Sequence, residues 1–169
     1  MKTVIDYLDY QSQKNPGKYA FRDLSSSFTY QQLKNNVDKV ASSLIKKDAN
    51  KEPIAIFIDK SIYTVELMLA IASCDCFYVV LDENSPYERI KKILSSLNPR
   101  FLLTDTKNSE KISSLIKNDF PATQVLIREE LEAEALDEKA VIERKQQINE
   151  DDLLYVLFTS DQLEHRKVS

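Results

Sequence analysis

Thr159 and Ser160 are the residue pair with the clearest capacity for chemistry, because two adjacent hydroxyls directly follow an apolar run. The run, residues 153–158, has no polar alternation, which predicts a strand buried on both faces of a sheet. Open α/β sheets bind their ligands at the carboxyl ends of the strands, so hydroxyls at this point suit phosphate oxygens. A phosphate-binding loop also needs glycines, since backbone N–H groups must surround the anion. Residues 161–169 contain none.

The remaining reactive side chains predict no catalytic residue and no metal site. His165, the one histidine, lies in the unusual last segment, and we expect an exposed bystander rather than a general base. Asp151 and Asp152 raise the alternative of a metal site, but adjacent carboxylates before a strand are usually solvated. Cys74 and Cys76 are too close and too few for a zinc site or a disulfide framework, which predicts buried free thiols.

Length, charge and composition exclude several classes of protein. A chain of 169 residues is expected to form one domain with a substantial core. The net charge of −4, with both signs mixed, gives no basic footprint for nucleic acid. No apolar run approaches the roughly 20 residues of a membrane helix and no signal peptide is visible, so we expect no membrane partner and a cytoplasmic location. The one glycine, Gly17, cannot supply a glycine-rich nucleotide loop.

Strands and helices alternate along the chain, which predicts an α/β fold. Apolar runs typical of buried strands are followed by stretches with apolar residues at helical spacing. The main expected strands are 54–58, 77–81, 100–104, 124–127 and 153–158, and the helices between them begin near residues 61, 85 and 109. This alternation favours a mostly parallel sheet with helices on both faces and right-handed crossovers.

Two other stretches have local features of their own. Thr29 and Gln32 predict a capping box at the start of a helix whose apolar residues, up to Ile45, recur at helical spacing. Residues 129–147 carry glutamates that repel one another at i, i+4 spacing, so any helix there is expected to be weak. We interpret the first stretch as core packing and the second as a solvated excursion before the last strand.

Residues 152–160, Asp-Leu-Leu-Tyr-Val-Leu-Phe-Thr-Ser, closely resemble the lead-in to the phosphate loop of adenylate-forming enzymes. This family comprises acyl-CoA synthetases, luciferases and the amino-acid adenylation domains of nonribosomal peptide synthetases. Residues 28–33 and 60–94 also resemble the family, in the family's order. Within the latter, the Pro-x-Glu-Arg-Ile that begins at Pro86 is similar to the amino-acid-activating branch, while Asp75 replaces a glycine of the family.

The resemblance implies that residues 1–160 are the N-terminal part of an AMP-binding, or adenylation, domain, with the fold of the N-terminal subdomain of these enzymes. The complete enzyme would be an ATP-dependent ligase, using Mg²⁺, that activates an amino acid as its aminoacyl-adenylate and passes it to a carrier-protein thiol. Thr159 and Ser160 would be the first cofactor-binding residues of the loop. No catalytic residue of the family is present, and the loop's glycines and the family's ribose-binding segment are missing, so we expect this truncated chain to bind no ATP usefully and to be inactive alone.

Residues 161–169 form an aberrant tail that departs abruptly from the family, whose loop continues Gly-Ser-Thr-Gly-x-Pro-Lys-Gly-Val. The residues present, Asp-Gln-Leu-Glu-His-Arg-Lys-Val-Ser, can be encoded GAT CAA CTG GAA CAC CGA AAG GTG TCA. One G placed before this string changes the reading to GGA TCA ACT GGA ACA CCG AAA GGT GTC, which encodes Gly-Ser-Thr-Gly-Thr-Pro-Lys-Gly-Val. We therefore expect an out-of-frame phosphate loop, from a frameshift or a sequencing error, and we interpret the match of Lys167 to the family's lysine as coincidence.

A different interpretation is a stand-alone, non-catalytic α/β binding or interaction module that uses the carboxyl edge of its sheet. Ligase sequence encoded downstream would favour the first interpretation, and a natural stop with the tail retained in relatives would favour the second. The sequence does not identify the activated acid, because it lacks the family's substrate-pocket residues. In a complete enzyme this part would pack against later polypeptide, so we expect the isolated chain to expose apolar surface and to aggregate or pack loosely.

Overall fold

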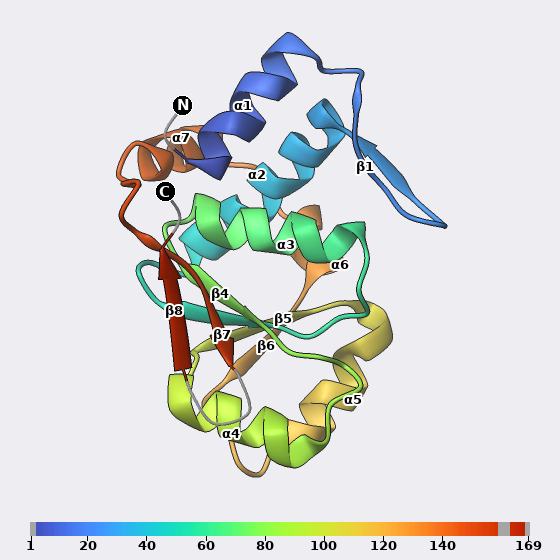
Figure 1. Ribbon diagram of the computed structural model, residues 1–169, viewed down its shortest axis with the longest axis vertical. Helices are drawn as coiled ribbons and strands as arrows, with labels where there is room; N and C mark the ends of the chain where they lie inside the picture. The colour runs from blue at the N-terminus through green and yellow to red at the C-terminus, as the bar shows by residue number, and fades with distance from the viewer. Residues whose placement is uncertain (1–2, 159–162, 168–169) are drawn as a thin grey trace.

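The sheet divides the molecule into three layers, with helices on either side of it (Figure 1). The computed structural model describes residues 3–158 and the backbone of residues 163–167. The helices are α1 (Val4–Lys14), α2 (Tyr30–Lys46), α3 (Ile62–Ser73), α4 (Tyr87–Leu97), α5 (Thr106–Ile116), α6 (Arg128–Ala133) and α7 (Glu138–Lys145). The strands are β1 (Tyr19–Arg22), β2 (Ser27–Thr29), β3 (Pro53–Ile56), β4 (Phe77–Val80), β5 (Phe101–Thr104), β6 (Gln124–Ile127), β7 (Leu153–Phe158) and β8 (Leu163–Lys167).

Five parallel strands form the body of the sheet, in the order β6-β5-β3-β4-β7. At one edge β8 adds to β7 in the antiparallel direction. β1 and β2 form a separate antiparallel pair. The predicted α/β class and the mostly parallel sheet are therefore confirmed.

Separate hydrophobic cores lie on the two faces of the sheet. On the first face, α3 packs with α1, α2 and α6, and on the second face α4 and α5 pack against the strands. Fully buried side chains of the first core include Leu33, Leu44, Ile54, Ile56, Leu67 and Ile71, and those of the second core include Phe57, Leu81, Ile90, Leu94 and Leu102. Parallel strands require this arrangement, because both of their faces are apolar.

The helix α2 begins with the predicted capping box. Thr29 Oγ1 accepts a hydrogen bond from Gln32 N at 3.2 Å, and Gln32 Oε1 accepts one from Thr29 N at 3.0 Å. The apolar residues Val37 and Val40 of the same helix are completely buried. The interpretation of this stripe as core packing is correct.

The segment from α6 to α7 packs against the body of the protein through the buried Leu131 and Val141, so the prediction of a solvated excursion is wrong in part, although most of its other residues are exposed. Ser43 Oγ donates a hydrogen bond to the Leu131 carbonyl at 2.7 Å, which ties α6 to α2. Lys145, at the end of α7, lies 3.1 Å from Asp9 and 2.8 Å from Asp38, which ties α7 to α1 and α2. All these partners are far away in sequence, so the local charge pattern gave no sign of them.

The strand β7 is less buried than its apolar sequence predicts. Val156 is buried, but Leu157 is 46% exposed and the other four residues are half-buried. β7 meets β4 through the pair Tyr78 and Tyr155, whose rings stack with their centres 5.8 Å apart. An apolar cavity lies beside Leu154, so the helices of the described chain cover this strand only in part. The predicted burial on both faces is therefore wrong for β7.

Cys74 and Cys76 are free and buried at the turn that follows α3, as predicted. Among the residues that the structure describes, no helix is both long enough and apolar enough to cross a bilayer.

One carboxyl group lies inside the first core. Glu66 of α3 has no exposed surface, and among the described residues neither of its carboxyl oxygens has a well-aligned hydrogen bond. Arg128 Nη1 lies 4.0 Å from Glu66 but 3.0 Å from Glu132, with which it forms the closer ion pair. Burial, followed by the neighbouring Glu132 carboxyl, raises the pKa of Glu66 to about 9. Glu66 therefore holds its proton at neutral pH.

We predict that Glu66→Gln flattens the dependence of stability on pH. The pKa of Glu66 rises from its ordinary value of 4.5 to about 9 on folding, so this group destabilises the folded state progressively as pH rises through that window. Between about pH 6 and about pH 8.5, the free energy of unfolding should fall by about 1 kcal/mol per pH unit more in the parent than in the variant. Urea unfolding followed by circular dichroism measures this difference.

Glu143→Gln is the control for this prediction, because the Glu143 side chain is 60% exposed. It should keep the parent's dependence on pH. Equal slopes for the parent and Glu66→Gln would contradict a raised pKa at Glu66.

Candidate functional site

The carboxyl ends of the parallel strands lie side by side and form the carboxyl edge of the sheet, beside the start of α4 (Figure 1). Open α/β sheets bind their ligands at this edge. Thr159 and Ser160 lie outside the described residues, so their predicted contact with a cofactor stays a prediction. Phe158, the residue before them, is described and ends β7 at this edge.

Arg89 of α4 anchors the end of β7. Its Nη2 donates a hydrogen bond to the carbonyl oxygen of Phe158 at 2.9 Å, across 69 residues of sequence. A charged donor makes this bond stronger than one between neutral groups. Arg89 therefore helps to set the point at which the chain leaves the sheet. Sequence reasoning finds Arg89 only as part of a family resemblance and misses this contact, because a bond between distant elements has no local signal.

The turn between β4 and α4 shapes the same edge. Asp82 Oδ1 accepts a hydrogen bond from Asn84 N at 2.9 Å, and the Asp82 carbonyl accepts one from Ser85 N at 3.0 Å. Beside this turn is a cavity of about 100 Å³, lined by Asp82, Ser85, Arg89, Phe158 and apolar neighbours. Polar side chains and a small hollow therefore lie together at the end of β7.

A second polar cluster lies just beyond the ends of β3 and β5, where its charges are paired. Asp59 forms an ion pair with Lys107 and lies 3.4 Å from Asn108 Nδ2. The hydrogen bond from Lys107 lowers the pKa of Asp59. Asp105 caps α5 by accepting a hydrogen bond from Asn108 N at 2.9 Å. Folding accounts for these contacts, and they indicate no ligand.

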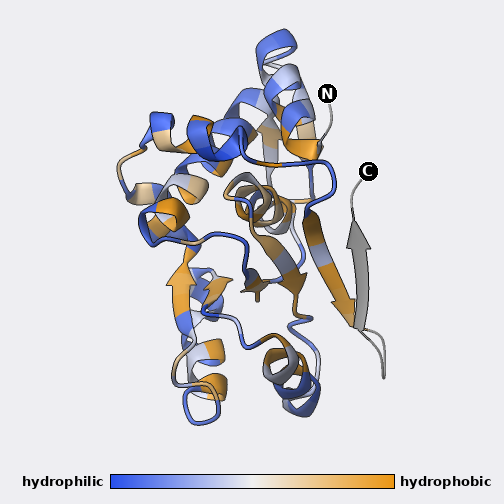
Figure 2. Ribbon diagram, turned by 90° about the vertical axis from the view of Figure 1, so that its left-hand side faces the viewer, coloured by the Kyte–Doolittle hydropathy of each residue, from blue (hydrophilic) through white to orange (hydrophobic). Residues whose placement is uncertain are grey.

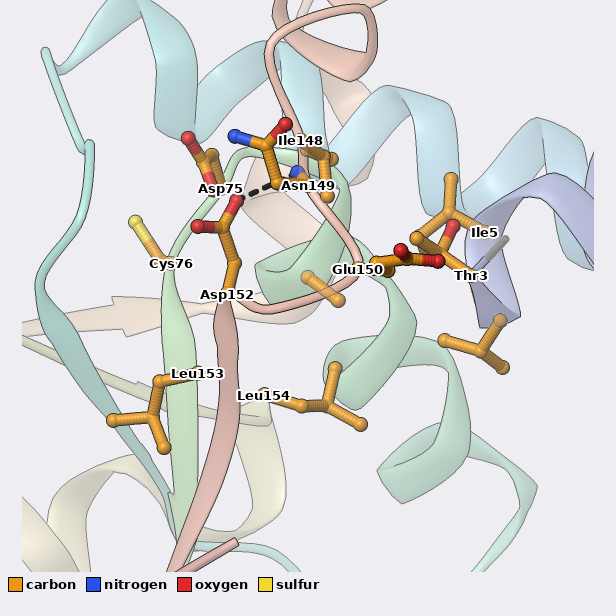
Figure 3. Close-up of a pocket in the computed structure, with 12 residues that line it drawn as sticks. Thr3, Ile5, Asp75, Cys76, Ile148, Asn149, Glu150, Asp152, Leu153 and Leu154 are labelled. Atoms are coloured by element: carbon orange, nitrogen blue, oxygen red, sulfur yellow. Dashed lines mark hydrogen bonds between the residues drawn. The ribbon is translucent and has the colours of Figure 1, made fainter. Parts of the chain in front are cut away.

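A third polar cluster lies at the opposite, amino ends of the strands, where β4 and β7 begin (Figure 3). Lys51 Nζ lies 2.9 Å from Asp75 and 3.5 Å from Asp152, and Asn149 N donates to Asp152 at 2.8 Å. Asp151 is exposed, as expected for a solvated carboxylate, whereas Asp152 is half-buried and paired. Within the described part of the chain, no group of three or more histidine, cysteine or acidic side chains is placed to hold a metal ion.

Asp75 combines a buried carboxylate with a backbone conformation that favours glycine. Its φ is 61°, in the left-handed region, directly after Cys74 at the end of α3. The Asp75 carbonyl accepts a hydrogen bond from Lys51 N at 2.8 Å, and this bond helps to hold the backbone conformation. Burial raises the pKa of Asp75, and the Lys51 ammonium opposes this change. The family that the sequence resembles has a glycine at this position, in agreement with the backbone.

The described residues do not make up a site for the ATP and Mg²⁺ that the resemblance implies. A triphosphate site needs several backbone N–H groups that converge on the anion, which glycines permit. Gly17, the one glycine of the chain, follows α1 rather than β7. Arg89 brings a cation to the edge, but one of its donors is bound to Phe158. No step of an ATP reaction follows from these residues alone.

Residues 8–160 match the family model of the AMP-binding enzyme. The D-alanine–D-alanyl carrier protein ligase of Staphylococcus aureus (strain MRSA252) is 29% identical to this chain over 160 residues. That alignment covers 95% of this chain and 30% of the relative. The family match ends at Ser160, immediately before the segment that departs from the family.

Solved structures show the same fold. The Klebsiella oxytoca NpsA N-terminal subdomain in complex with 3-hydroxyanthranilyl-AMSN has a TM-score of 0.74 and 25% identity, over 95% of this chain and 38% of that one. The Bacillus subtilis o-succinylbenzoate CoA synthetase (MenE) in complex with its acyl-adenylate intermediate OSB-AMP has a TM-score of 0.74 and 19% identity, over 96% and 41%. This chain thus spans 30% of the curated relative's length and has the fold expected for the N-terminal subdomain.

We predict that Arg89→Ala loosens the end of β7 without unfolding the protein. The Phe158 carbonyl loses a charged donor that contributes about 1 kcal/mol at this exposed position. Local opening should therefore become roughly five- to tenfold more frequent, which speeds amide hydrogen exchange at residues 156–158. Lys92→Ala, on the exposed side of the same helix, is the control and should leave this exchange unchanged. Unchanged exchange in Arg89→Ala would show that the bond anchors nothing.

We predict that Asp75→Gly is more stable than Asp75→Ala by about 1 kcal/mol, because glycine adopts a φ of 61° without a steric penalty. Both variants lose the ion pair with Lys51, so the difference between them isolates the backbone effect. The urea concentration at the midpoint of unfolding measures it. Equal midpoints for the two variants would exclude backbone strain at this turn.

Proposed function

Because this chain belongs to the family of AMP-binding enzymes, we propose that it is the N-terminal part of an ATP-dependent adenylate-forming ligase. The complete enzyme would activate an amino acid as its aminoacyl-adenylate, with ATP and Mg²⁺, and transfer it to the thiol of a carrier protein. The observation that carries the proposal is the family match from residue 8 to Ser160, which ends just past the last described residue of β7. A phosphate loop at that point would lie at the carboxyl edge of the sheet.

The substrate class and the partner are supported by two observations. The curated relative is named for an amino acid, D-alanine, and for a carrier protein. The Pro-x-Glu-Arg-Ile that begins at Pro86 resembles the amino-acid-activating branch rather than the fatty-acyl branch. We extend both properties to this protein. The use of ATP, together with the free thiols of Cys74 and Cys76, fits a cytoplasmic location.

This chain's own contribution would be to position the start of the phosphate loop. Arg89 holds the Phe158 carbonyl, so Thr159 and Ser160 follow from a fixed strand end. Their hydroxyls would bind phosphate oxygens of ATP. When bound, ATP supplies the pyrophosphate leaving group. Residues 161–169 lack the glycines that such a loop needs. On this proposal the chain alone binds no ATP and is inactive.

We attribute the missing glycines to a shifted reading frame in residues 161–169. When one G is placed before this segment, the first residue becomes glycine for either aspartate codon, because the new triplet is always GGA. The other positions allow only a few residues each, and all nine can take the family's loop residues together. A frameshift also explains why the departure begins abruptly at Asp161, after an intact lead-in. Slow divergence does not explain this.

We predict that restoring the frame creates an amino-acid-dependent ligase. One G inserted between codons 160 and 161 of the cloned gene should give a longer product that exchanges pyrophosphate into ATP when its amino acid is present. The unaltered product should show no exchange, and calorimetry should detect no ATP binding at micromolar affinity. Assays with each protein amino acid and with D-alanine cover the proposed substrate class. A matched control inserts GGA at the same place, which preserves the original frame and should give an inactive product.

Exchange or micromolar ATP binding by the unaltered chain would contradict its proposed inactivity. A restored frame that soon reaches a stop codon would contradict the ligase proposal and favour the stand-alone interaction module.

A further inference from the structure

Cys74 and Cys76 lie at a tight turn between the end of α3 and the start of β4. Asp75, between them, adopts the left-handed conformation, and Cys76 N donates a hydrogen bond to the Ile71 carbonyl at 3.1 Å. Asp75 N donates to the Ala72 carbonyl, also at 3.1 Å. These bonds form the Schellman motif of a helix C-terminus, which turns the chain back on itself. The turn therefore holds two cysteines, one residue apart, at the end of α3.

The two thiols of this turn interact with each other. A hydrogen bond between them lowers the pKa of Cys76, although burial opposes this change, and raises the pKa of Cys74. Arg144 Nη1 donates to the Cys74 carbonyl at 2.8 Å, and the charge of this guanidinium favours the thiolate form of both cysteines. The backbone N–H of Glu52 also stabilises the Cys76 thiolate. Cys76 is therefore the more acidic thiol, and a protonated thiol lies beside it.

Cys76, but not Cys74, lines a cavity of about 30 Å³ (Figure 3). The lining of this cavity includes Asn149 and Glu150, which are exposed, so the cavity lies at the protein surface. A cavity of this volume holds about two water molecules, or one molecule of similar size. Access to the sulfur of Cys76 is therefore limited to very small reagents.

The walls of this cavity favour a neutral reagent over an anion. Asp75, Asp152 and Glu150 contribute carboxyl groups, and the one ammonium of Lys51, which pairs with both aspartates, offsets only part of this charge. Leu153 contributes an apolar wall at the start of β7, which Figure 2 shows as a largely hydrophobic strand. Hydrogen peroxide is small and uncharged, whereas oxidised glutathione is large and negatively charged. The cavity therefore suits hydrogen peroxide as the oxidant.

We propose that Cys74 and Cys76 form a redox pair that hydrogen peroxide oxidises to an intramolecular disulfide. This property is independent of the proposed function. The Cys76 thiolate attacks one oxygen of the peroxide, the O–O bond breaks, and a sulfenic acid forms on Cys76. The hydroxide that leaves takes up the proton that Cys76 has lost.

The thiol of Cys74 resolves this sulfenic acid. Its sulfur attacks the sulfur of Cys76, the S–S bond forms and the S–O bond breaks. The leaving hydroxide takes the proton of the Cys74 thiol. Two thiols and one peroxide thus give one disulfide and two water molecules.

The test uses the whole chain, which contains no other cysteine, so a disulfide within the monomer must join this pair. Peroxide should lower the intact mass by two hydrogen atoms and remove both free thiols, and dithiothreitol should reverse both changes. The folded chain should form the disulfide at least about fivefold faster than the chain unfolded in urea, because the turn places the thiols together and favours the Cys76 thiolate. Buried thiols with a purely structural role would instead react faster after unfolding.

Cys74→Ser and Cys76→Ser distinguish the two roles, and each variant is the control for the other. Cys74→Ser should accumulate the sulfenic acid of Cys76, which dimedone labels. Cys76→Ser should be labelled at least about tenfold more slowly, because Cys74 has no exposed surface and does not line the cavity. Equal labelling of the two variants would overturn the assignment of Cys76 as the thiol that reacts first.

The comparison of the folded and unfolded parent needs no variant, so a folding defect in either serine variant does not affect it. Three results with the folded parent would overturn the redox pair. They are survival of both thiols in peroxide, slower oxidation than in the unfolded chain, and formation only of dimers with a disulfide between two chains.

Discussion

Burial of the central strand β3 on both faces is the constraint on which the rest of this structure depends. Ile54, Ala55 and Ile56 have no exposed surface. A parallel strand that is apolar on both faces needs helices on both sides, and this need explains the two cores that α3 and α4 help to form. The same constraint weakens toward β7, which lies near the edge of the sheet and borders the apolar cavity beside Leu154.

Periodicity predicted the elements whose local pattern reflects their burial. The stripe of α2, the run of β3 and the capping box of Thr29 and Gln32 all depend on residues close in sequence, and all are present. The segment from α6 to α7 was misread because its glutamates repel locally, whereas Lys145 finds Asp9 and Asp38 only after folding. β7 was misread for the opposite reason. Its residues are apolar, but their burial depends on what lies beside the strand.

The candidate site likewise combines features that the local sequence predicts with contacts that form only in the tertiary structure. The apolar run of residues 153–158 was sufficient to predict that Thr159 and Ser160 follow a strand of the sheet. Arg89 could not be predicted as the anchor of that strand, because its bond to Phe158 spans 69 residues and joins two elements. Asp152, which the sequence placed with solvated carboxylates, is paired with Lys51 at the far edge. The local sequence was sufficient to predict where β7 ends, whereas the contacts of Arg89 and Asp152 depend on the tertiary structure.

Under the proposed function, a shift of frame after Ser160 accounts for the missing glycines of the phosphate loop. The nucleotide sequence of the gene across codons 159–169 and downstream of them tests this account most directly. The account predicts codons that, after one added base, encode Gly-Ser-Thr-Gly-x-Pro-Lys-Gly-Val and continue into an open ligase frame. Codons that cannot give this loop, or a shifted frame that stops shortly after it, would contradict the account.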